Sequence, residues 1–155
     1  MGIFLSTFVN RLDKKGRVSV PSTFRAALGS QSFQGIILFR SYTLSAIEGF
    51  GMDRMERLSQ QLDTMDLFSD TQNDLAASIF ADAHQLAFDG EGRVLLPELL
   101  CAHAHLSDQV AFVGRGATFQ LWNPEAFNHY QAQARDRLKV SKLSPGGQSS
   151  QGDAP

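Results

Sequence analysis

Hydrophobic and polar residues alternate in short runs near the start of the chain, as they do in half-buried β-strands. One such run ends at Pro21, which suits the first turn of a helix, and Phe24 and Leu28 then share one helical face. Gly29 favours the end of that helix. The pattern predicts a small β-rich unit with strands at 7–12, 18–20, 35–39 and 43–47 and a helix at 23–28.

The same pattern occurs a second time further along the chain. The segment Asp13–Pro21 (DKKGRVSVP) matches Asp89–Pro97 (DGEGRVLLP) at five of nine positions, at a spacing of 76 residues. Arg40–Ile47 aligns with Arg115–Trp122 at a spacing of 75, mainly in its apolar pattern. We interpret these blocks as two copies of one unit. The second copy is expected to have strands at 85–88, 94–96, 109–113 and 118–122 and a helix at 99–105.

Both copies contain the motif Asp-x-x-Gly-Arg between their first two strands. It runs from Asp13 to Arg17 in the first copy and from Asp89 to Arg93 in the second. Aspartate favours the start of a turn because its carboxylate accepts hydrogen bonds from nearby amides, and glycine supplies a positive φ. The motif therefore predicts a tight turn or bulged hairpin, in which Asp13 orients Arg17 through a charge-assisted hydrogen bond.

Helical patterns lie between the two copies. Apolar residues recur there at helical spacing, as in a flexible methionine-rich core stripe: Met52, Met55, Leu58, Leu62 and Met65. Ser69 and Asp70 are alternative N-caps for a second helix. That helix would carry Leu75, Ile79 and Phe80.

A further helix is predicted after the second copy. Asn123-Pro124-Glu125 provides a cap, a proline at the first position and an acid near the positive end of the dipole. The side chains expected to face inward are Phe127, Tyr130, Ala134 and Leu138. The predicted organisation is unit 1 at 7–50, a helical connector at 51–82, unit 2 at 83–127, a C-terminal helix at 128–140 and a disordered tail at 141–155.

Charge is unevenly distributed along a chain whose formal net charge is −2. Residues 1–40 carry six basic side chains and one acid, a balance of +5; residues 41–98 carry three and eleven, a balance of −8; the remainder is +1. The basic residues around the first motif are Arg11, Lys14, Lys15 and Arg17. Such a local excess suits contacts with phosphates, although chance variation of a surface would also produce it. In the second motif Glu91 would repel phosphate.

The sequence gives no indication of catalysis or of metal binding. His103 and His105 are two residues apart, which places them on different helix faces, and no third ligand stands nearby. Nucleophile elbows and phosphate-binding loops are missing, so we expect no enzyme, no cofactor and no small-molecule substrate. The single cysteine, Cys101, is compatible with a reducing cytoplasm. No apolar run is long enough to span a membrane, and the N-terminus does not have the pattern of a signal peptide.

These residues carry a resemblance to a known family. The segment Asp13–Pro21, its echo at Asp89–Pro97 and Gln120–Pro124 (QLWNP) before a helix resemble the MraZ family over residues 3 to about 138. The resemblance implies an α+β fold with two AbrB-like units in tandem, each a swapped-hairpin β-barrel, and flanking helices. It also implies a cytoplasmic, nucleoid-associated homo-oligomer, in which the subunits form a ring.

The resemblance further implies a function. Members of this family bind direct repeats in promoter DNA upstream of the division and cell-wall gene cluster, which includes their own gene, and regulate it mainly as repressors. The contacts would come from the first motif, namely Arg11, Asp13, Lys14, Lys15, Gly16 and Arg17. Lesser candidates are their equivalents Asp89, Gly92 and Arg93. The alternatives are an oligomeric protein-binding scaffold whose turns are purely structural, a small enzyme, and an AbrB-type antitoxin, which usually has only one such unit.

Overall fold

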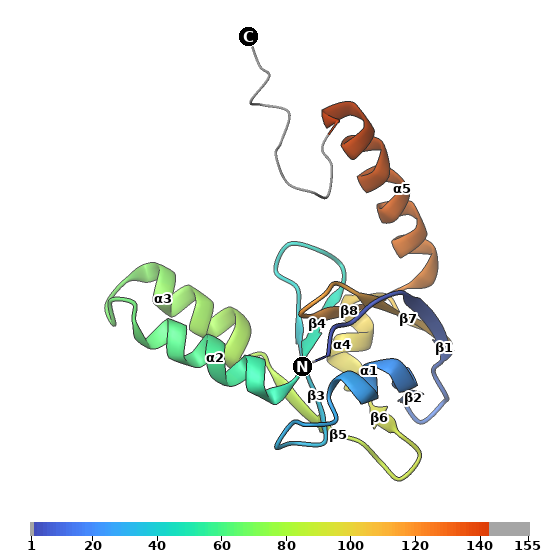
Figure 1. Cartoon of the computed structure of the whole chain (residues 1–155), viewed down its shortest axis with the longest axis horizontal. Helices are drawn as coiled ribbons and strands as arrows, with labels where there is room; N and C mark the ends of the chain where they lie inside the picture. Colours follow the sequence, from blue (N-terminus) through green and yellow to red (C-terminus); the bar gives the residue numbers. More distant parts are fainter. Residues whose placement is uncertain (1, 143–155) are drawn as a thin grey trace. The chain divides into compact units, whose positions relative to one another are not determined.

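The computed structural model describes residues 2–142, and the chain divides after Asn123 into two compact units. The first unit has the same series of elements in each sequence repeat (Figure 1). In the first repeat these are β1 (Thr7–Arg11), β2 (Arg17–Ser19), α1 (Ser22–Ala27), β3 (Gly35–Arg40) and β4 (Ile47–Phe50). In the second they are β5 (His84–Ala87), β6 (Arg93–Leu95), α4 (Glu98–His103), β7 (Gln109–Gly114) and β8 (Phe119–Trp122). The predicted mixed α+β class is confirmed, and both sheets are antiparallel.

Strands are exchanged between the repeats. The six-stranded sheet has the order β1-β7-β8-β4-β3-β5, and β2 pairs with β6 in a separate two-stranded ribbon. The first strand of each repeat thus pairs with the later hairpin of the other: Phe8 lies opposite Phe112, and Leu86 opposite Ile36. A unit of about 45 residues buries too little apolar surface for a stable core of its own. The exchange gives both repeats one shared core.

A local two-fold symmetry relates the repeats. Val18 lies opposite Val94 in the ribbon, and these residues are equivalent at the spacing of 76. Glu48 lies opposite Gln120 in the middle of the β4–β8 pair. Gln120 Nε2 donates to both carboxylate oxygens of Glu48, at 3.1 and 3.0 Å. Equivalent residues that pair with each other mark where the local axis passes through the sheet and the ribbon.

The predicted alignment of the later hairpins is wrong. Arg40 pairs with Ile47, and the corresponding closing pair of the second repeat is Gly114 with Phe119. The first hairpin therefore has a six-residue loop, at 41–46, and the second a four-residue loop, at 115–118. The predicted strand at 43–47 is mostly this longer loop. Ser41 Oγ accepts from the N–H groups of Thr43 and Leu44 at 3.3 and 3.1 Å, and such local bonds compete with strand pairing.

The main core of the first unit lies between the sheet and the short helices, and phenylalanines pack within it among aliphatic side chains. Phe24 of α1, Phe112 and Phe119 are almost completely buried. The ring of Phe24 lies 5.2 Å from that of Phe4 and 5.4 Å from that of Phe119. Edge-on and tilted ring contacts of this kind add to the free energy gained by burial. The predicted helices are confirmed within one or two residues at each end.

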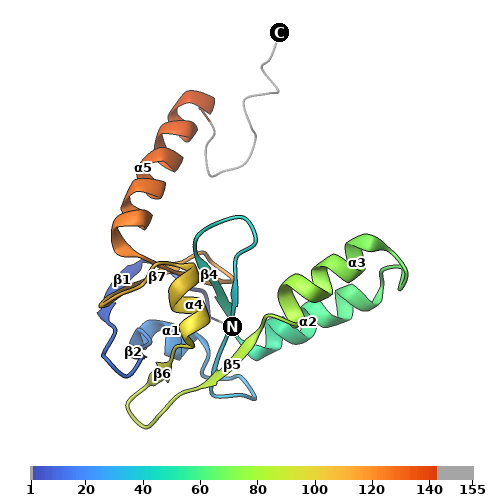
Figure 2. The same cartoon turned by 180° about the vertical axis from the view of Figure 1, so that it is seen from behind.

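Two helices and a π-helical turn connect the repeats: α2 (Met52–Asp63), α3 (Asp70–Leu75) and η1 (Ala76–Phe80). In both views α2 and α3 lie side by side and project from the strands (Figures 1 and 2). Met52, Met55 and Leu58 pack against a small apolar cluster, but the stripe does not reach Met65 because α2 ends at Asp63. Of the two candidate caps, Ser69 is the N-cap, and its hydroxyl accepts from the N–H of Gln72 at 3.1 Å.

The second unit contains α5 (Pro124–Ser141), which begins at Pro124 as the Asn123-Pro124-Glu125 pattern predicted, four residues before the predicted bound at 128. Within it, the rings of Phe127 and Tyr130 lie 6.5 Å apart, and the guanidinium of Arg137 lies over Tyr130. Leu138 was expected to face inward, but half of it is exposed. None of the helices at residues 2–142 is long and apolar enough to cross a membrane. Most of the predicted tail, 143–155, lies outside the described residues.

Candidate nucleic-acid interface

The first Asp-x-x-Gly-Arg motif forms a turn held by its own side chains. Asp13 Oδ1 accepts from the N–H groups of Lys15 and Arg17 at 2.9 and 2.8 Å. Gly16 has a φ of +85°, and its N–H donates to the carbonyl of Asp13 at 3.0 Å. Arg17 Nε donates to Asp13 Oδ2 at 2.9 Å. The predicted roles of aspartate, glycine and arginine in forming the turn are confirmed.

The second motif has the same geometry. Asp89 Oδ1 accepts from the N–H groups of Glu91 and Arg93 at 2.8 and 2.9 Å, and Arg93 Nε donates to Asp89 Oδ2 at 2.9 Å. Gly92 has a φ of +75°. This turn has one further ion pair, in which Glu91 Oε2 lies 3.6 Å from Arg93 Nη1. Arg93 therefore faces two carboxylates where Arg17 faces one.

Both aspartates are held in the charged form. The pKa of Asp13 is lowered from its ordinary value of 3.8, first by the hydrogen bond from the N–H of Arg17 and then by the Arg17 side chain. The pKa of Asp89 is lowered in the same way by the N–H of Arg93. The hydrogen bond to Asp89 in turn raises the pKa of Arg93. Each turn is therefore fixed by an ion pair throughout the neutral range.

Each turn is also bonded to the other repeat. The N–H of Leu96 donates to the carbonyl of Gly16 at 2.8 Å, and the N–H of Val20 donates to the carbonyl of Gly92 at 3.1 Å. Figures 1 and 2 show both turns at one end of the strand body, next to the paired β2 and β6. The predicted hairpin is only partly correct. β1 and β2 share a single bridge, Leu12 with Val18, and then enter different sheets.

The two turns differ in the charge around them. Lys14 and Lys15 are exposed on the first turn, next to the half-buried Arg17. Arg11 is exposed at the end of β1, two residues before Asp13. At the positions of Lys14 and Lys15 the second turn has Gly90 and Glu91. Three of the four predicted cations therefore lie on the first turn itself, with Arg11 at the end of the strand before it, whereas Arg93 on the second turn faces two carboxylates.

Arg25 is a residue that the sequence did not assign to either turn. It comes from α1 of the first repeat, yet its guanidinium lies against Gly92 of the second turn. A Cβ at Gly92 would be 2.7 Å from Arg25 Cζ. Arg25 Nε donates to the carbonyl of Val20 at 3.1 Å, which fixes the side chain there. The equivalent position in the second repeat is Cys101, and this difference was the only indication available in the sequence.

Comparison with known proteins identifies the family. The family model described as "MraZ protein, putative antitoxin-like" matches residues 3–77 and 79–142. The chain belongs to the MraZ family. It is 47% identical over 145 residues to "Transcriptional regulator MraZ" of Rickettsia bellii (strain OSU 85-389), covering 93% of this chain and 97% of the relative. With the same coverage, the proteins of that name from Rickettsia africae (strain ESF-5) and Rickettsia typhi (strain ATCC VR-144 / Wilmington) are 45% and 41% identical over 144 residues.

The resemblance predicted from the two motifs is therefore confirmed, and each of the two matched segments contains one of the two repeats of the MraZ-family chain. The relatives bear the name of a regulator and not of an enzyme. Within residues 2–142 no group of three or more His, Cys, Asp or Glu side chains could hold a metal ion. His103 instead has a structural contact, since its Nε2 lies 3.0 Å from the carbonyl of Leu44.

Proposed function

We propose that this MraZ-family protein is a sequence-specific DNA-binding transcriptional regulator that contacts DNA through its first turn. The observation that carries the proposal is the hydrogen-bonded turn at Asp13–Arg17, which presents exposed lysines and an oriented arginine. Nε of Arg17 donates a hydrogen bond to Asp13. The Nη groups of Arg17 have no protein partner within the described residues. A guanidinium held in this way can form a bidentate contact with a phosphate or with a guanine edge.

Each residue of the turn has a proposed role. Arg11, Lys14 and Lys15 contribute positive charge to phosphate contacts, and Arg17 contacts a phosphate or a base. Asp13 and Gly16 act indirectly, by fixing the backbone from which these side chains project. Asp89, Gly92 and Arg93 form the equivalent, weaker contact. Arg25 adds to that second contact a positive charge which the second repeat lacks.

The finer features of the proposal follow from the family resemblance. We propose that the exchanged strands represent two AbrB-like swapped-hairpin units, at 7–50 and 83–127, joined by the connector at 51–82. Several subunits would form a ring and meet direct repeats in promoter DNA, so that weak single contacts gain avidity. The proposed target is the division and cell-wall gene cluster including the protein's own gene, mainly under repression. The proposed location is the cytoplasm, at the nucleoid.

A specific observation favours one alternative function. Each arginine already donates its Nε to the aspartate of its own turn, as it would if the turns were purely structural. The protein would then be an oligomeric scaffold that binds other proteins. DNA binding separates the two functions, because only a regulator prefers its native upstream sequence and loses affinity as salt rises, by about 0.9 log units per phosphate contact for each log unit of salt.

The test is fluorescence anisotropy with the gene's own upstream DNA and a scrambled control, over a salt series. Arg17→Ala is compared with Arg93→Ala, which removes the equivalent side chain from the second turn. We expect Arg17→Ala to weaken binding at least about tenfold and Arg93→Ala to weaken it less. Circular dichroism and solution mass would show that both variants remain folded and assembled. A wild-type protein without preference for the native DNA would support the scaffold instead.

A further inference from the structure

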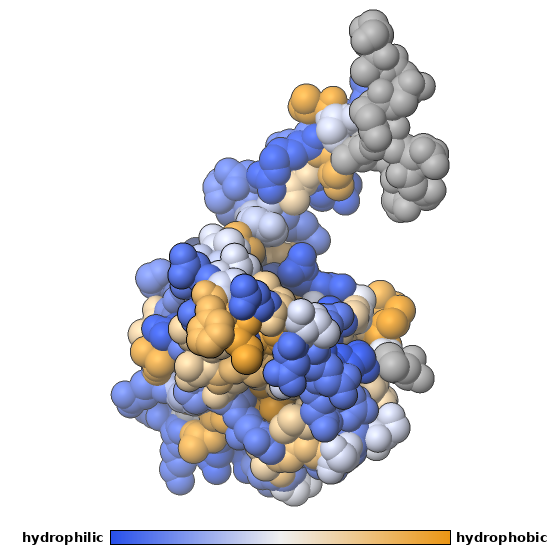
Figure 3. Space-filling model, turned by 90° about the vertical axis from the view of Figure 1, so that its left-hand side faces the viewer, coloured by the Kyte–Doolittle hydropathy of each residue, from blue (hydrophilic) through white to orange (hydrophobic). Residues whose placement is uncertain are grey.

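The tip of the helical connector exposes two large apolar side chains. Leu67 is 65% exposed and Phe68 is 89% exposed, between α2 and α3. The turn that presents them is formed by local bonds: Asp66 Oδ1 accepts from the N–H of Phe68 at 3.0 Å, and the carbonyl of Asp66 accepts from the N–H of Ser69 at 3.0 Å. In Figure 3, which faces the side from which α2 and α3 project, hydrophobic residues lie among hydrophilic ones. Leu67 and Phe68 together form a small exposed apolar patch, which is a candidate contact with a partner.

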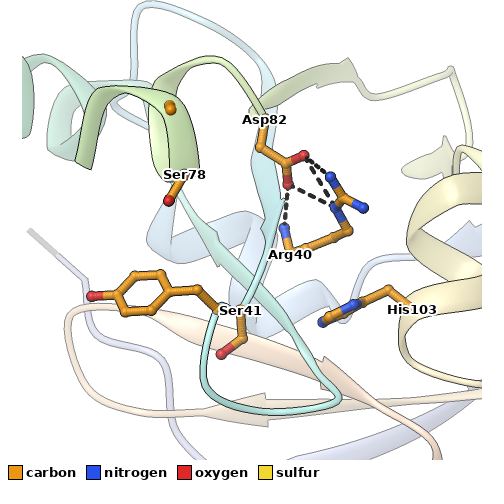
Figure 4. A pocket seen from close by; sticks show the side chains of 7 residues that line it. Arg40, Ser41, Ser78, Asp82 and His103 are labelled. Carbon is orange, nitrogen blue, oxygen red and sulfur yellow. Dashed lines mark hydrogen bonds and ion pairs between the residues drawn. The ribbon is translucent and has the colours of Figure 1, made fainter. Parts of the chain in front are cut away.

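A groove of matching chemistry lies at the other end of the connector. Its apolar part is a cavity of about 220 Å³ whose wall includes Phe39, Phe50 and Ile79. Past Ser41 and Tyr42 it continues into a polar cavity of about 300 Å³, where Asp82 lies 2.6 Å from Arg40 Nη2 (Figure 4). The loop at 41–46 forms one side and is anchored to α4 through His103 and the carbonyl of Leu44. The groove is therefore preformed.

Size and charge make the tip and the groove complementary. A cavity of about 150 Å³ is large enough to bind benzene, so the apolar part of this groove can accept a phenyl ring. The outward charges beside the groove are positive, because Arg40 and Arg115 are 40% and 52% exposed while their partners Asp82 and Glu48 are only 12% and 21% exposed. The tip is negative, since Asp66 and Asp70 flank Phe68.

The tip cannot reach the groove of its own chain. α2 begins at Met52, two residues after Phe50 in the groove wall, and extends over 12 residues. At 1.5 Å per residue this helix carries the tip about 18 Å away. The occupant that the chain itself offers is therefore the tip of another copy.

We propose that Phe68 of one copy inserts into the groove formed by Phe39, Phe50 and Ile79 of a second copy. Two different surfaces meet in this contact, so it is head-to-tail, and repetition closes a ring if the rotation between copies allows it. The inference rests on the proposed self-assembly and gives that assembly its interface. It is independent of the first turn, because none of Asp13–Arg17 lines the groove or belongs to the tip.

The first test is the mass of Phe68→Glu in solution, measured by light scattering after gel filtration. Phe68 contacts little of its own chain, so the variant should fold, as circular dichroism would verify. We expect the subunit dissociation constant to rise at least about 30-fold, as for a central interface residue. Val140→Glu is the matched control, because Val140 is 84% exposed on α5. Assembly lost in Val140→Glu but kept in Phe68→Glu would overturn the proposal and identify α5 as the occupant.

Cysteine cross-linking tests the direction of the contact. Thr43 lines the groove. Thr43→Cys and Phe68→Cys should therefore each remain uncross-linked alone, and their equimolar mixture should form covalent dimers. The variant that carries both cysteines should form a series of covalent oligomers. Covalent dimers of Phe68→Cys alone would indicate a tip-to-tip contact and overturn the proposal. An assembled wild type whose mass is unchanged in Phe68→Glu would overturn this interface only. A monomeric wild type would refute the proposed self-assembly as well, whatever its affinity for DNA.

Discussion

The two Asp-x-x-Gly-Arg turns share one backbone frame and differ in what surrounds it. In each, the aspartate caps two amides and binds its arginine at 2.9 Å. The first turn adds Lys14 and Lys15, whereas the second adds Glu91 and receives Arg25 from the first repeat. The comparison teaches that the motif itself specifies the backbone conformation of the turn, and that the charges of neighbouring residues decide whether the turn can bind a phosphate.

The largest expected effect comes from giving the first turn the residues of the second. Lys14→Gly combined with Lys15→Glu should weaken binding to the upstream DNA on the order of 100-fold at moderate salt, because two cations are lost and one anion is gained. The melting temperature should hardly change, since the Asp13–Arg17 frame remains. Anisotropy and thermal melting measure the two effects. Unchanged affinity would show that the charge difference between the turns has no role in DNA binding.

Substituting the turn glycines sharpens the comparison. Gly16→Ala and Gly92→Ala should each destabilise the fold by about 1–2 kcal/mol, because both positions have a positive φ. Only Gly92→Ala should also displace Arg25, whose guanidinium occupies the space of the new methyl group. Urea unfolding measures the first effect. For the second, DNA affinities of Gly92→Ala, Arg25→Ala and the double variant should be non-additive. Additive losses would contradict a role of Arg25 at the second turn.

The acid dependence of stability should be shared by the turns. A carboxyl with a lowered pKa stabilises the fold above its unfolded value of 3.8, and this stabilisation is lost as pH falls below that value. Asp13→Asn and Asp89→Asn should therefore each make the loss of stability below that pH less steep, and to a similar extent. Unfolding at a series of acidic pH values measures this. A change in only one variant would show that the two frames are not equivalent.

The smallest expected effect is that of Glu91→Gln. Glu91 is 74% exposed and lies 3.6 Å from Arg93, so the free energy of unfolding should change by less than about 0.5 kcal/mol. DNA affinity should rise roughly threefold because the substitution removes a negative charge that repels the phosphates of DNA. Anisotropy against wild type, with Glu125→Gln on α5 as a control for loss of one acid, measures the rise. A decrease would indicate that Glu91 positions Arg93 for the contact.

Local chemistry explains which predictions from sequence were correct. The turns follow from residues within five positions of one another, and the short helices after Pro21 and Pro97 begin within one residue of their predicted starts. The strand at 43–47 was wrong because the bonds of Ser41 to nearby amides form a loop that a pattern of alternation does not reveal. The prediction for Leu138 was wrong for a different reason, since an apolar residue at helical spacing need not be buried.

The sequence by itself determined the repeat, the two turns and the family, because each depends on residue types at fixed spacings. Only the tertiary structure decided the exchange of β1 and β5 between the repeats, since strand pairing depends on contacts between segments up to about a hundred residues apart. It also placed Arg25 against Gly92, from another repeat and another element. Such contacts have no local pattern, because they arise from burying two incomplete units in one core.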